Sequence, residues 1–264
     1  YDKYCKILME IKIIYEMNPP KVLNDNHYDN DTIRKNVDIF ISKTKRISES
    51  VDGIHLTDNV LGVPRVSSLM LVSMLKKNGI TKPISCTCRL YDKNLISVLQ
   101  FVTEAILCGV YSILVLRGDD PIIGNKFFNI SPSKVIKILS EHNFNNYIKL
   151  DLSFPNEVND TMKIKNKLEA KPRAFVTQSI SNIDNLRDIV KVSAPYGIDV
   201  IPCIMCPSSR NEISAQNIGL DWHSYKERPE NFIREAASLT KKILLCSPNS
   251  FEDGLHLVRK LREA

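Results

Sequence analysis

The chain has 264 residues, 43% of them hydrophobic and 25% charged, which is the composition of an ordinary globular protein with a substantial core. Its 36 basic and 30 acidic residues give a formal charge of +6 without a long block of one sign, which favours an anionic small molecule over nucleic acid as partner. The sequence has no signal-peptide pattern and no apolar run of membrane length, and its seven cysteines are scattered, so we expect a cytoplasmic protein with reduced thiols and no membrane partner.

A repeated unit runs along the chain: a short β-rich run, a polar loop, and a longer segment with helical periodicity. We predict strands at Lys12–Met17, Gly53–Thr57, Pro83–Cys88, Ser112–Leu116, Tyr147–Leu152, Ala174–Gln178, Asp199–Met205 and Gly254–Val258. We predict helices at Asp31–Glu49, Val66–Asn78, Asn94–Cys108, Pro132–His142, Thr161–Ala170, Asn182–Ala194 and Asn231–Leu245.

The helix ends carry their own signals. Gly79, Gly109 and Gly197 stand where C-terminal caps are expected, and Ser131 before Pro132 is typical of an N-cap and first helical residue. Strands that alternate with helices build a parallel sheet, and eight such units allow the sheet to close. We therefore predict an α/β protein, a (β/α)8 TIM barrel that spans residues 1–264 as a single domain.

The chemistry of such a barrel lies on the loops after its strands. The predicted strand ends are rich in acids, amides and hydroxyls, in chain order Glu16, Thr57, Asp58, Thr87, Arg117 to Asp120, Phe154, Gln178, Ser208 and His256. The sequence has no nucleophile elbow and no P-loop, which disfavours hydrolases and kinases. Cys203 and Cys206 would lie on opposite faces of a strand, so we predict no metal site, and we interpret His256 as a packed core residue.

Four motifs occur in order on the expected strands: Glu16-Met17-Asn18-Pro19-Pro20, Leu116-Arg117-Gly118-Asp119-Asp120-Pro121, Val176-Thr177-Gln178, and Gly197-Ile198-Asp199-Val200 with Ile201-Pro202. With them the chain resembles the methylenetetrahydrofolate reductases, whose catalytic domain is a flavin-binding (β/α)8 barrel. The resemblance covers most of the chain.

The resemblance implies an oxidoreductase of one-carbon metabolism and methionine biosynthesis, which reduces 5,10-methylenetetrahydrofolate or a related pterin carrier to the 5-methyl form. Glu16 corresponds to the general acid, because a carboxyl shielded from water keeps its proton near neutral pH. Asp119 is implied to lie by the flavin and the pterin, where its charge acts on both. Gln178 is implied to bind the pterin edge, and Glu212 occupies a position that often carries a substrate-binding Gln.

FAD is the implied cofactor, and its contacts fall on Thr57, Ser85, Leu116, Arg117, Gly118, Asp119, Phe154 and Lys167. Ser85 stands where many members have His, and Phe154 replaces a common Tyr. The segment 156–170 is shorter than usual and lacks the Pro-Glu-x-His pattern, so FMN or a flavin supplied by a partner stays open. NADH or NADPH as donor would use the same pocket in turn, since the sequence has no G-x-G-x-x-G.

Two alternatives remain. The shortened segment allows a flavin-free, pterin-binding accessory subunit of a methyl-transfer or electron-transfer complex. A barrel lyase would instead use a strand lysine such as Lys149 as a Schiff base. An electron-donor protein stays open as a partner, we expect a homo-oligomer as in many family members, and the chain length predicts no regulatory domain.

Overall fold

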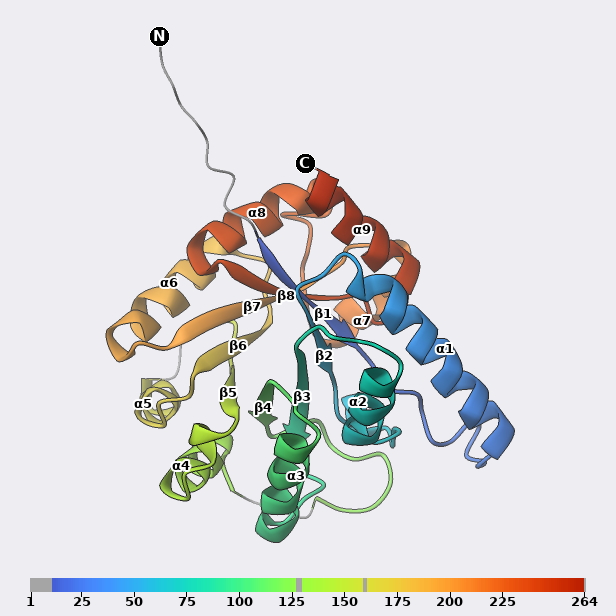
Figure 1. Ribbon diagram of the computed structural model, residues 1–264. Helices are drawn as coiled ribbons and strands as arrows, with labels where there is room; N and C mark the ends of the chain where they lie inside the picture. Colours follow the sequence, from blue (N-terminus) through green and yellow to red (C-terminus); the bar gives the residue numbers. More distant parts are fainter. Residues whose placement is uncertain (1–10, 127–129, 159–160, 264) are drawn as a thin grey trace.

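Eight parallel strands close into a barrel in sequence order, with β8 returning to pair with β1 (Figure 1). The computed structural model describes residues 11–126, 130–158 and 161–263. The strands are β1 (Lys12–Met17), β2 (Gly53–Leu56), β3 (Ile84–Arg89), β4 (Ser112–Leu116), β5 (Lys149–Phe154), β6 (Ala174–Ser179), β7 (Asp199–Met205) and β8 (Lys242–Cys246). The predicted fold class is confirmed.

Helices surround the barrel and cover its outer face (Figure 1). They are α1 (Asn30–Ser48), α2 (Ser68–Lys77), α3 (Leu95–Leu107), α4 (Pro132–Glu141), α5 (Thr161–Glu169), α6 (Ile183–Ser193), α7 (Glu212–Asn217), α8 (Pro229–Thr240) and α9 (Phe251–Glu263). The short helical turns are η1 (Val60–Gly62), η2 (Phe144–Asn146), η3 (Ala194–Tyr196) and η4 (Ser209–Asn211). Within the described part of the chain, no helix combines the length and the hydrophobicity needed to cross a bilayer.

The predicted helix ends are confirmed. The Ser131 side chain accepts the backbone N–H of Lys134 at the start of α4, where Pro132 is the first residue. Gly79, Gly109 and Gly197 all have positive φ, the backbone region in which a residue without Cβ ends a helix at low cost.

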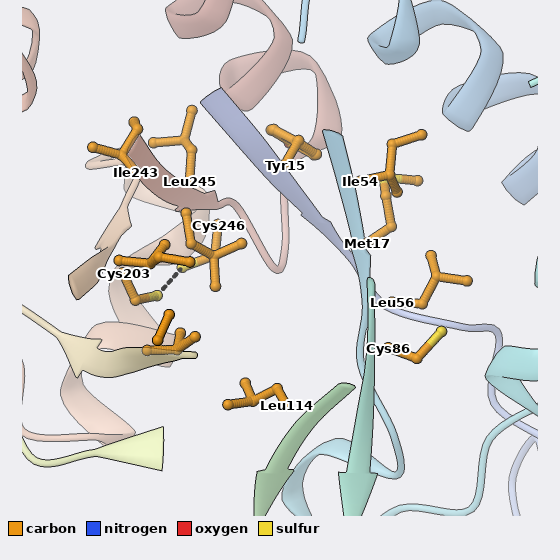
Figure 2. Packing of buried hydrophobic residues seen from close by; sticks show 14 of the residues in the cluster. Tyr15, Met17, Ile54, Leu56, Cys86, Leu114, Cys203, Ile243, Leu245 and Cys246 are labelled. Atoms are coloured by element: carbon orange, nitrogen blue, oxygen red, sulfur yellow. Dashed lines mark hydrogen bonds between the residues drawn. The ribbon is translucent and has the colours of Figure 1, made fainter. Parts of the chain in front are cut away.

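Alternation along each strand sorts side chains between the helix-facing layer and the barrel interior. Figure 2 shows Met17, Leu56 and Cys86 on the helix-facing side of β1 to β3, with Leu114 and Cys203 on the side of the interior. On β1 and β2 the intervening residues Glu16 and His55, which are register partners, therefore point inward.

The structure corrects the last predicted strand and helix. The eighth strand is Lys242–Cys246, whereas the predicted strand Gly254–Val258 lies inside α9. The helix predicted to reach Leu245 ends at Thr240, so its last residues are β8. His256 is consequently an exposed residue of α9 and not a packed residue of a core strand.

Candidate active site

Most of the predicted site residues gather at the carboxyl end of the barrel, where the parallel strands all finish. Glu16 is the last but one residue of β1, Thr57 follows β2, and Gln178 is the last but one residue of β6. Leu116 ends β4 and is followed directly by Arg117, Gly118 and Asp119. Strands from all around the barrel thus contribute side chains to one mouth.

Glu16 has the electrostatic surroundings of an acid that holds its proton. Burial raises the pKa of its carboxyl from 4.5 to about 7, because desolvation disfavours the charged form. Among the described residues, no side chain or backbone group donates a hydrogen bond to this carboxyl, and no cation forms an ion pair with it. Its electrostatic neighbours include the thiol of Cys246, whose pKa is raised as well. Near neutral pH the carboxyl is therefore divided between its neutral and ionised forms.

A cavity of about 280 Å³ opens beside Glu16. Its walls come from β1, from Asn36, Ile39 and Lys43 of α1, and from the Ser247–Asn249 loop after β8. Asp119 and Gln178 do not line this cavity, although they lie at the same end of the barrel. This recess therefore lies on the α1 side of β1, next to the strand position of Glu16.

Asp119 fixes the loop that follows β2. Its Oδ2 accepts the backbone N–H of Leu61 at 3.1 Å, and Leu61 lies in a turn with a positive φ of 57°. The side chain itself is exposed at the mouth. Asp119 therefore joins the β2 and β4 loops while one face of its carboxylate stays open to a ligand.

Arg89, the last residue of β3, supports the loops at the mouth and was not among the predicted site residues. Only 1% of it is exposed, and its guanidinium donates to the carbonyls of Asn59, at 2.7 Å, and of Asp119. Its Nε lies 2.8 Å from Asp92 Oδ2, which balances the buried charge. In the sequence, Arg89 directly follows the predicted strand Pro83–Cys88, and the acid Asp92 lies three residues later.

Gly118 has a backbone conformation that Arg89 requires. Its φ is +94°, and a Cβ at this position would lie 2.7 Å from Arg89 Cγ and 2.9 Å from Cδ. The glycine thus allows the arginine to pass directly beneath the β4 loop. The side chain that approaches Gly118 closely is that of Arg89, and the flavin contact implied for Gly118 stays a prediction.

Two cations stand together at the mouth. Lys167 donates to the carbonyl of Ser153, and desolvation, with a contribution from nearby Arg117, lowers the pKa of its ammonium to about 8. Arg117 is exposed. Two adjacent positive charges in a partly desolvated place are an arrangement that a bound anion stabilises.

Thr57 and Gln178 complete this end of the barrel. The Thr57 hydroxyl donates to Asn18 Oδ1 at 2.8 Å, which links the loops after β1 and β2. A β-bulge shifts the pairing of β6 with β7 between Val176 and Ser179, and Gln178 lies within it with an exposed side chain. Bulges at barrel rims re-aim side chains, so the amide of Gln178 is available to a ligand.

Three of the expected contact residues are placed differently from the rest. Phe154 is 1% exposed and its ring packs on Phe175, so a ligand at the mouth would meet its backbone and not its ring. Ser85 is the second residue of β3 and lines a cavity at the opposite, amino-terminal end. Glu212 begins α7 on the connection after β7 and is exposed.

A buried histidine occupies the space beside Ser85. His55 Nδ1 lies 2.9 Å from Ser85 Oγ, and Nε2 lies 2.9 Å from Thr87 Oγ1. Desolvation lowers the pKa of His55 to about 4, so the imidazole is neutral at physiological pH. A histidine is thus present at this level of the barrel, supplied by β2 and not by β3. Among the described residues, no group of three or more His, Cys, Asp or Glu side chains is arranged to hold a metal ion.

Comparison with known proteins agrees with the barrel fold. The family profile described as methylenetetrahydrofolate reductase matches residues 10–217, and a comparison with curated proteins gives no match. Among solved structures, the chain is similar to a tryptophan synthase complex from Pyrococcus furiosus, with a TM-score of 0.57 and 13% identity over 96% of this chain and 98% of that chain. It is also similar to tryptophan synthase from M. tuberculosis, with a TM-score of 0.57 and 10% identity over 97% and 91% of the two chains. These structures show the fold alone. The family profile spans most of the chain, and the chain therefore belongs to the methylenetetrahydrofolate reductase family.

Proposed function

We propose that the protein catalyses the flavin-dependent reduction of 5,10-methylenetetrahydrofolate, or of a related pterin carrier, to the 5-methyl form, with Glu16 as general acid. The observation that carries this proposal is the carboxyl of Glu16, which stands at the barrel mouth of a family member with its pKa raised to about 7. Catalytic acids are tuned in this way toward the working pH.

The residues at the mouth fit a flavin with an anionic tail. Arg117 and Lys167 supply adjacent positive charge for a diphosphate, the β4 loop at Gly118 offers its backbone, and the Thr57 hydroxyl lies on the neighbouring loop. We propose FAD, with FMN or a partner's flavin as alternatives, and NADH or NADPH as the donor that uses the same site in turn. Reduced flavin, when bound, supplies the hydride.

The residues of the chain then have separate tasks. Opening of the five-membered methylene ring requires a proton on a weakly basic nitrogen, and neutral Glu16 delivers it. The Asp119 carboxylate, held in place by Leu61 N–H, stabilises the cationic iminium that results. The exposed Gln178 amide donates to and accepts from the polar edge of the pterin, and Glu212 is placed to contact substrate from the β7 side.

The purified protein separates this proposal from that of a flavin-free pterin-binding subunit, which the short segment 156–170 favours. Protein reconstituted with FAD is reduced anaerobically and mixed with methylenetetrahydrofolate, and flavin reoxidation and methyl product are measured together. We expect both at comparable yield, and unchanged rates in the control Asp184→Asn, whose carboxylate pairs with Arg187 on the surface of α6. Colourless protein that takes up neither FAD nor FMN would favour the accessory subunit.

The wider setting is proposed with the function. We place the protein in the cytoplasm, in one-carbon metabolism and methionine biosynthesis, as a homo-oligomer in which each barrel is a catalytic domain.

A further inference from the structure

A second cavity, of about 300 Å³, lies at the amino-terminal end of the barrel, away from the mouth that holds Glu16. Its inner wall is apolar and comes from barrel-interior residues of five strands, namely Ile14, Leu114, Val176, Ile201 and Leu244. Its outer part is polar and includes Lys12, Lys242 and Arg173. A volume of this size accommodates a small organic ligand.

The two lysines stand side by side. Lys12 begins β1 and Lys242 begins β8, and their Cα atoms are register partners in the parallel pair that closes the barrel. Like charges at such neighbouring positions repel each other. Within the described residues, neither ammonium has a carboxylate oxygen within 4.0 Å, so no ion pair relieves this repulsion.

The acids of the cavity are engaged by arginines. Asp151, which is 3% exposed, forms a two-point ion pair with Arg173, through Nε at 2.8 Å and Nη2 at 2.6 Å. Asp52 accepts the backbone N–H of Ile13 at 2.8 Å and a hydrogen bond from Arg262. Lys242 acts on Asp151 only at longer range.

The remaining polar groups of the cavity carry no negative charge near neutral pH. His55 is neutral and bonded to Ser85, and Ser112 hydrogen-bonds to Asp151. The Tyr111 hydroxyl accepts a hydrogen bond from Lys149 at 2.6 Å, which brings a further cation to the rim. The outer end of the cavity therefore has an excess of positive charge above an apolar floor.

We propose that this cavity is a binding site for a small organic anion, with its carboxylate between Lys12 and Lys242 and its apolar body directed toward Leu114 and Leu244. Such a ligand removes the repulsion between the lysines and fills the apolar end with a matching surface. The site is separate from the proposed catalytic mouth and does not depend on flavin.

Benzoate is a suitable probe, because it joins a carboxylate to an apolar ring, and benzyl alcohol is its neutral counterpart. Calorimetric titration of the full chain should show saturable benzoate binding, at least tenfold weaker binding of benzyl alcohol, and at least tenfold loss of benzoate affinity in Lys12→Met and in Lys242→Met. Lys242→Arg should restore binding. Lys226 is exposed and lies in the turn before α8. Lys226→Met is the control variant and should leave the benzoate affinity unchanged.

A melting experiment also tests the lysine variant in the absence of ligand. Lys242→Met should melt higher than the wild type without ligand, because the repulsion is gone, and benzoate should no longer raise its melting temperature. Benzoate that binds the lysine variants as tightly as the wild type, or that fails to bind the wild type at millimolar concentration, would overturn the proposal.

Discussion

At the scale of single residues, Glu16 and His55 both point into the barrel, and burial favours the neutral form of each side chain. Desolvation raises the pKa of the Glu16 carboxyl to about 7 and lowers that of the His55 imidazole to about 4. As pH rises from about 4.5 to 7, the fold loses stability through Glu16, and as pH falls from about 6.5 to 4 it loses stability through His55. The two effects oppose each other in the wild type, so a variant is needed to separate them.

Glu16→Gln isolates the contribution of the carboxyl. The folded wild type binds this proton more tightly than the unfolded chain, so its stability falls as pH rises through 7, whereas the amide does not titrate. We expect the variant to be more stable than the wild type by about 2 to 3 kcal/mol at pH 8 and by little at pH 4.5. Urea unfolding at both pH values measures the difference, and an advantage that does not change with pH would contradict the assignment.

Gly118 and Arg89 should be coupled energetically. Gly118→Ala places a Cβ against the arginine stem, and we expect a loss of about 2 to 4 kcal/mol. Gly124→Ala is the matched control: its φ is +82°, but no atom lies within 4 Å of the added Cβ, so it measures the backbone cost alone. In the double variant Gly118→Ala with Arg89→Ala, the loss should be smaller than the sum of the single losses by about 1 kcal/mol or more. Additive losses would show that the arginine does not set this loop.

At the scale of elements, seven of the eight strands were predictable because each is a short apolar run set off from its helix by a polar loop. β8 is different, since Lys241 alone separates it from α8, and Ile243, Leu244 and Leu245 extend the apolar pattern of the helix. Hydrophobic periodicity alone does not show where a helix ends when a short buried strand follows it directly. The predicted strand Gly254–Val258 is instead part of a helix. Its buried positions 254, 255, 257 and 258, together with 261, follow a helical period that is visible only over the full length of α9.

The turn between α8 and β8 gives a direct test of this boundary. Lys241 has a φ of 62° at the C-cap of α8, a conformation that glycine adopts without strain. We expect Lys241→Gly to stabilise the protein by about 0.5 to 1 kcal/mol, and Lys191→Gly, in the last turn of α6, to destabilise it by a similar amount. A destabilising Lys241→Gly would mean that the helix continues through this residue.

The same scale explains for which candidate site residues the position at the mouth was predictable. Glu16, Thr57, Arg117, Asp119 and Gln178 follow from strand ends, because a parallel barrel brings all of them to one mouth. The positions of the Ser85 and Phe154 side chains depend on how deep each residue lies along its strand and on which face of the sheet it lies. The resemblance alone did not give this information. Arg89 escaped notice because its role arises from carbonyl groups of two distant loops.

At the scale of the whole molecule, the last helix is hydrogen-bonded to the segments that precede β1 and β2. Arg262 of α9 donates to the carbonyls of Ser50 at 2.8 Å and of Ile11 at 2.9 Å, and it pairs with Asp52. These contacts join residues more than 200 positions apart at the place where the barrel closes. Their removal should therefore weaken the entire fold and not only one end of it.

Arg262→Met tests this closure. We expect it to lower the free energy of unfolding by about 1 to 3 kcal/mol, because the carbonyls of Ile11 and Ser50 and the carboxylate of Asp52 lose their donor together. Lys260→Met removes a cation from the same helix whose partner, Glu230, lies 3.4 Å away at the surface, and it should change stability by less than about 0.5 kcal/mol. Guanidinium unfolding curves of the two variants measure the contrast, and equal effects would argue against a closing role.

The whole molecule is proposed to place a neutral acid beside a hydride donor, and the pH dependence of a single half-reaction tests that placement most directly. Protein reconstituted with FAD and reduced anaerobically is mixed with methylenetetrahydrofolate at a series of pH values, and flavin reoxidation is followed in wild type and Glu16→Gln. We expect the wild-type rate to fall about tenfold per pH unit above the Glu16 pKa of about 7, and the variant to be slower by about 10²-fold or more at pH 6 with no such fall. Equal rates with the same pH profile in both proteins would contradict the role of Glu16.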